Sequence, residues 1–139
     1  MERDSFLWSE VRLIIAAVAL FLGGIPVLYV VLPIPALFGL IRVVLILAWI
    51  ISGIASCYLL DRWYKNGMKL FGKKDAWDTT AFLVACISGI NLGLAGLFGR
   101  NIGMTIASSQ LIFVLVGLIY LATAWRLFQR WNVSGKKLF

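Results

Sequence analysis

The chain has 139 residues, of which 62% are hydrophobic and only 14% charged, whereas soluble domains usually carry about 25% charged residues. Charged side chains are absent over 13–41, 43–60, 79–99 and 101–125. About 20 apolar residues cross a bilayer once. This pattern excludes a soluble domain and predicts an all-α membrane protein with four transmembrane helices in a single domain, residues 1–139. The net charge of +7 comes from basic residues near helix ends, which argues against a nucleic-acid partner.

The first predicted helix runs from about 11 to 32. It contains Gly23, Gly24 and Pro26, so we expect a bend in its outer half. The mixed charge at the start of the chain and the long apolar run do not fit a signal peptide, and we expect this helix to be retained. Prolines then mark a tight turn, and the second helix is expected at about 36–60.

The segment 61–78 forms the one substantial predicted loop, and it is rich in basic residues. The third helix is expected at about 79–98, with Asp78 as its N-cap. The fourth helix is expected at about 102–131, where its last turns leave the membrane.

The basic residues are distributed unevenly between the two sides of the predicted bundle. Eleven of the 13 Lys and Arg residues fall in the two termini and the 61–78 loop, while Arg42 and Arg100 lie on the opposite side. The positive-inside rule therefore predicts a cytoplasmic loop and cytoplasmic termini. Anionic headgroups on the cytoplasmic side are the expected lipid partner, and the candidate contacts are Arg62, Lys65, Lys69, Lys73, Lys74, Arg126 and Arg130.

The two halves of the chain share a weak pattern. Gly24-Ile25 is followed 65 residues later by Gly89-Ile90, and Gly53 is followed 64 residues later by Gly117. A tandem duplication of a two-helix unit would produce this pattern. The predicted fold is therefore two consecutive hairpins, which a parallel repeat would relate.

Small residues recur four apart in the third predicted helix and, over a shorter stretch, in the second. Such ridges let membrane helices approach closely. Packing inside the monomer and contact between copies in a homo-oligomer both remain open. The candidate packing residues are Ala81, Ala85, Gly89, Gly93 and Gly96, with Ala48, Ser52 and Ser56.

Polar side chains inside the spans need partners. The amide of Asn91 is expected to form a hydrogen bond with Ser108, Ser109 or Gln110 on the fourth helix. These polar groups either stabilise the packing of the two helices or line a site for a small solute. Arg42 is the one ionisable side chain expected near a span. It can extend to the outer interface or bind an anion or a lipid headgroup.

The sequence contains few side chains that could take part in catalysis. The chain has no His, and all its carboxylates are expected outside the spans. Histidine ligation of haem, a nucleophile paired with a base, and proton-coupled transport are therefore not expected. No metal, cofactor or catalytic residue is predicted, and the protein is expected not to be an enzyme.

Residues 81–120 contain the run Ser88-Gly-Ile-Asn-Leu-Gly-Leu-Ala-Gly, followed later by Leu115-Val-Gly-Leu-Ile-Tyr. This segment resembles the YuzA-like family of small prokaryotic membrane proteins of unknown function. Asn91, Gly93, Leu94 and Gly96 fall on the family motif, whereas Leu92 replaces a Trp. The resemblance implies a prokaryotic plasma (inner) membrane protein and brings no activity with it.

The sequence favours a non-catalytic integral membrane protein that acts through helix packing, as an accessory subunit of a membrane partner or as a homo-oligomer. The alternative is a minimal channel or uniporter for a small solute or ion. A phage-like permeabilising or immunity protein is a third hypothesis.

Overall fold

The computed structural model describes residues 2–22, 26–98 and 110–135. Every regular element in these ranges is a helix. The elements are α1 (Glu2–Phe21), α2 (Val27–Val31), the short 3-10 helix η1 (Pro35–Leu37), α3 (Phe38–Lys65), α4 (Ala76–Phe98) and α6 (Gln110–Val133).

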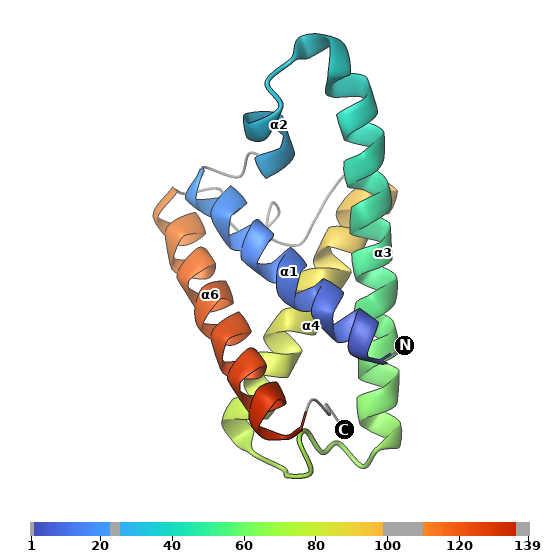
Figure 1. The fold of residues 1–139 in the computed structure, drawn as a ribbon, viewed down its shortest axis with the longest axis vertical. Helices are drawn as coiled ribbons and strands as arrows, with labels where there is room; N and C mark the ends of the chain where they lie inside the picture. The colour runs from blue at the N-terminus through green and yellow to red at the C-terminus, as the bar shows by residue number, and fades with distance from the viewer. Residues whose placement is uncertain (1, 23–25, 99–109, 136–139) are drawn as a thin grey trace.

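The long helices form a bundle in which α1 runs obliquely between α3 and α6, with α4 behind it (Figure 1). The most extensive helix contacts join α3 to α4, and the next join α1 to α6. The sequence predicted that the first helix would pair with the second and the third with the fourth. The closest-packed pairs are therefore different from those of the predicted hairpins.

Three helices in the described residues are long and apolar enough to cross a membrane, at Pro35–Lys65, Ala76–Phe98 and Leu111–Val133. These spans indicate an integral membrane protein. The first predicted helix does not appear as one segment over 11–32. In its place α1 begins at Glu2 and ends at Phe21, and Pro26 has extended backbone angles directly before α2. Proline lacks the N–H that would continue a helical ladder, which explains a break here rather than a bend.

The predicted loop 61–78 is shorter in the structure, at 66–75. Helix α3 continues to Lys65, whose Nζ lies 3.0 Å from the Asp61 carboxylate one turn earlier. Helix α4 begins before the predicted N-cap. Asp75 caps it, because Asp75 Oδ1 accepts hydrogen bonds from the backbone N–H groups of Trp77 and Asp78 at 2.8 and 3.1 Å.

The start of α1, the end of α6 and the 66–75 loop lie at the same end of the bundle. The rings of Phe6 and Trp131 are 5.3 Å apart, and Leu70 from the loop is buried in the same apolar core. The contact between Phe6 and Trp131 brings the start of α1 and the end of α6 side by side.

Candidate functional site

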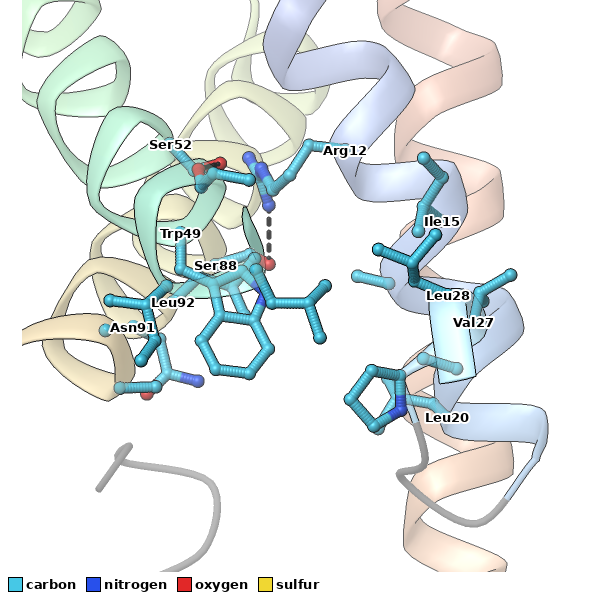
Figure 2. A pocket seen from close by; sticks show the side chains of 18 of the residues that line it. Arg12, Ile15, Leu20, Val27, Leu28, Trp49, Ser52, Ser88, Asn91 and Leu92 are labelled. Carbon is cyan, nitrogen blue, oxygen red and sulfur yellow. Dashed lines mark hydrogen bonds between the residues drawn. The ribbon is translucent and has the colours of Figure 1, made fainter. Parts of the chain in front are cut away.

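A partly open cavity of about 1330 Å³ lies between α1, α2, α3, α4 and α6. Figure 2 shows two facing walls: Ile15, Leu20, Val27 and Leu28 on one side, and Trp49 and Leu92 on the other. Its described lining is mostly apolar. Cavities of this kind, with a few polar groups at one place, are typical ligand sites.

Arg12 is the most polar group in this lining. The residue is only 7% exposed, and its side chain reaches from α1 to α4 (Figure 2). Its two terminal nitrogens donate hydrogen bonds of 2.8 Å each, one to Ser88 Oγ and the other to the backbone carbonyl of Ala85. Its buried Nε has no hydrogen-bond partner. Arg12 therefore lies in the cavity wall as a buried charge, and its unpaired Nε is itself inaccessible.

Arg12 and Glu10 were not predicted to be buried. The prediction placed every carboxylate outside the spans and named Arg42 alone as an ionisable residue near one. Glu10 is buried in the bundle at 6% exposed, although α1 is not among the three apolar spans. The predicted helix began near residue 11, one residue after Glu10, whereas α1 begins at Glu2. A helical face running through Trp8, Arg12 and Ile15, at spacings of four and three, was the available signal.

A second polar contact ties α1 to α3. Trp8 Nε1 donates to Ser52 Oγ at 2.9 Å, and this hydroxyl donates to the carbonyl of Ala48 at 2.8 Å. All three residues line the cavity. The polar end of the cavity is thus built from three different helices, α1, α3 and α4.

The predicted small-residue ridges meet inside the chain, at the α3–α4 contact. A methyl group at Gly89 would overlap Ser56 Oγ, and one at Gly93 would lie 2.9 Å from the Cα of Gly53. Gly96 packs against the Ile50 side chain in the same way. The other predicted packing residues on these two helices are buried or half-buried: Ala81, Ala85, Ala48, Ser52 and Ser56.

The predicted polar residues are placed only in part. Asn91 lines the cavity (Figure 2), and so does Arg42, which is otherwise exposed. Ser108 and Ser109 lie outside the described residues. Gln110 begins α6, and the contact expected between it and Asn91 also lies outside what the structure describes.

Two of the basic residues expected at lipid headgroups bind a buried carboxylate of the protein. Arg126 Nε and Arg130 Nε donate to the two oxygens of Asp78, at 2.9 and 3.0 Å. The Asp78 side chain is fully buried, and Arg126 also lies 3.4 Å from Asp75. The remaining headgroup candidates are exposed or nearly so at this end of the bundle: Arg62, Lys65, Lys69, Lys73 and Lys74.

The pKa of Asp75 is lowered from its ordinary value of 3.8. The main cause is the hydrogen bond from the backbone N–H of Asp78, joined by that from Trp77 and by the charges of Arg126 and Arg130. These donors all favour the ionised carboxylate. Asp75 therefore acts as a charged cap at the start of α4.

No protein-family model, curated protein or solved structure matches this chain. The resemblance of 81–120 to the YuzA-like family therefore stays a prediction. Within the described ranges, no three His, Cys, Asp or Glu side chains are grouped as metal ligands would be.

Proposed function

We propose that this is a non-catalytic integral membrane protein that holds a largely apolar ligand inside its helix bundle. The observation that carries the proposal is the cavity of about 1330 Å³, whose lining is mostly apolar, with a polar end at Arg12, Ser52 and Ser88 and two further polar residues, Arg42 and Asn91. This volume exceeds the range of about 300–1,000 Å³ of most small-molecule sites. Its walls come from five helices, so occupation would also hold the bundle together.

The test is native mass spectrometry after extraction in a mild detergent. We expect one bound ligand molecule per protein chain. Leu92→Trp fills the cavity from α4 and should remove it. Ile87→Trp adds the same bulk to an exposed position of the same helix and should retain it. Equal occupancy in both variants would contradict the proposal.

A second candidate is a minimal channel or uniporter, and one observation favours it. Arg12 and Arg42 both line the cavity, so a solute passing through it would be an anion. Anion efflux from liposomes that is faster with the protein than with its Leu92→Trp variant would support this function. Equal efflux would exclude the cavity as the pathway.

The accessory-subunit and homo-oligomer hypotheses remain proposals with less support. The small-residue ridge that motivated a contact between copies is occupied by α3 within the same chain. The same mass spectra test them, because a stoichiometric protein partner or a dimer would be seen directly.

A further inference from the structure

The cavity contains a positive charge that the described part of the chain does not neutralise by direct contact. Arg12 takes part in none of the ion pairs between described residues. Its two hydrogen bonds end on neutral oxygens, of Ser88 and Ala85. A buried charge is unfavourable unless it is paired, and inside a membrane protein it marks a functional site by default.

Glu10 does not fill this role, although it is close in the sequence. Two residues separate by about 200° around a helix, so Glu10 and Arg12 lie on opposite faces of α1. Glu10 shares its face with Phe6 and Ala17, which contact Trp131 and the Gly117 position of α6. Arg12 shares its face with Trp8, which contacts α3. Glu10 therefore lies on the face of α1 that packs against α6, and it forms none of the direct ion pairs found between described residues.

The Arg12 guanidinium has more N–H donors than the two that form hydrogen bonds. It carries five N–H groups in a planar fork that suits a carboxylate or phosphate. The hydrogen bonds to Ser88 and Ala85 fix the fork at the cavity wall, and the buried Nε remains without a partner. The two terminal nitrogens carry four N–H groups, of which these bonds use two, so Arg12 is a pre-oriented cation in the cavity wall with donors left for an anion.

The rest of the described lining suits an acyl chain. Away from Arg12 the cavity is walled by Ile15, Leu20, Val27, Leu28 and Leu92 (Figure 2). A free inorganic anion would gain nothing from these apolar walls, whereas an amphiphile buries its chain against them. The bilayer around the three apolar spans is a ready source of such molecules.

We infer that Arg12, held by Ser88 and the Ala85 carbonyl, binds the anionic head of an acyl-chain amphiphile whose chain lies along α2 and the facing wall of α3 and α4. This inference rests on the proposed function and names the ligand class of the same cavity. The head is a carboxylate or a phosphate.

The experiment compares oleate with oleyl alcohol, which share a chain and differ in the charge of the head. Protein in phosphatidylcholine nanodiscs is titrated with brominated oleate, which quenches tryptophan fluorescence on contact, and the two unbrominated compounds compete with it. The wild type should prefer oleate by at least about tenfold, since a charge-assisted bond is lost with the alcohol.

Arg12→Gln should erase this preference while still binding the alcohol, and Arg12→Lys should keep part of it. Arg3→Gln removes the same charge from an exposed position of the same helix and should leave the preference unchanged. If Arg12→Gln does not fold, the comparison of oleate with oleyl alcohol in the wild type still tests the inference. Leu92→Trp, which retains Arg12, should then lose both compounds.

Equal binding of oleate and oleyl alcohol by the wild type would overturn the inference and leave the proposed function standing. Binding of neither compound would count against both. A preference that survives in Arg12→Gln would also overturn the role of Arg12. Acetate and inorganic phosphate test the free-anion source, and displacement of oleate by either at equal concentration would show that the acyl chain contributes nothing.

Discussion

Asp78 Oδ2 accepts a hydrogen bond from Arg130 Nε at 3.0 Å, and this contact joins the first turn of α4 to the last turns of α6. The carboxylate is fully buried, while the guanidinium remains about a third exposed. The two arginine contacts replace water around this carboxylate. Asp78 fixes how α4 and α6 pack at this end of the bundle.

Replacing Asp78 by Asn should destabilise the protein more than any other single charge change at this end. The variant leaves two arginines facing a neutral amide, and breaking a buried pair costs about 3–5 kcal/mol. The matched control is Asp61→Asn, which breaks an exposed pair with Lys65 and should cost less than about 1 kcal/mol. Denaturant unfolding in detergent measures both, and equal losses would show that burial of Asp78 is unimportant.

Asp75 should make stability depend on pH in the acid range. Its pKa is lower in the folded protein, so the carboxylate stabilises the fold at neutral pH. This contribution is complete above the ordinary pKa of 3.8 and is lost as the pH falls through the lower folded value. Asp75→Asn retains a capping oxygen that does not titrate. Its thermal midpoint should therefore fall less steeply than that of the wild type as the pH falls from about 5 to about 2. Parallel curves would exclude Asp75 as a source of the acid dependence.

Alanine at Gly89 should destabilise the α3–α4 contact by about 1–3 kcal/mol, because the new methyl group overlaps Ser56 Oγ. Gly39→Ala is the matched control. It lies in a helix with nothing within 4 Å of the added carbon and should stabilise by about 0.5–1 kcal/mol. Adding Ser56→Ala to Gly89→Ala should restore part of the loss. A Gly89→Ala variant as stable as Gly39→Ala would mean that the close approach is not needed.

Single cysteines at Asp4, Asn66 and Ile34, in a background without Cys57 and Cys86, test the arrangement in the membrane. All three positions are exposed. Asp4 and Asn66 lie at the end of the bundle where the basic residues gather, so both should react with a membrane-impermeant reagent from the cytoplasmic side only. Ile34, before α3, should react from the opposite side. Reaction of Asn66 and Ile34 from the same side would rule out a crossing by α3.

The sequence predicted the helical class and the extents of α3 and α4 to within a few residues. These helices follow long uncharged blocks, and hydropathy locates such blocks well. It failed at α1, which begins at Glu2 and not near residue 11, and which ends at Phe21, ahead of the extended Pro26. It also failed to pair Asp78 with Arg126, which lies 48 residues away. That contact exists only once α4 and α6 lie side by side, and no local pattern encodes it.

The packing of α1 against α6 has a consequence for the order of assembly. Helix α1 is synthesised first, yet Phe6 and Ala17 contact Trp131 and the Gly117 position of α6, the helix synthesised last. Contacts between distant segments form late, because the chain must close a long loop before it gains them. The three apolar spans can enter the bilayer independently. A nascent chain that stops before α6 therefore leaves the Glu10 face of α1 unpacked, although Arg12 can already reach Ser88 and Ala85 on α4. Quality-control proteases should recognise that state.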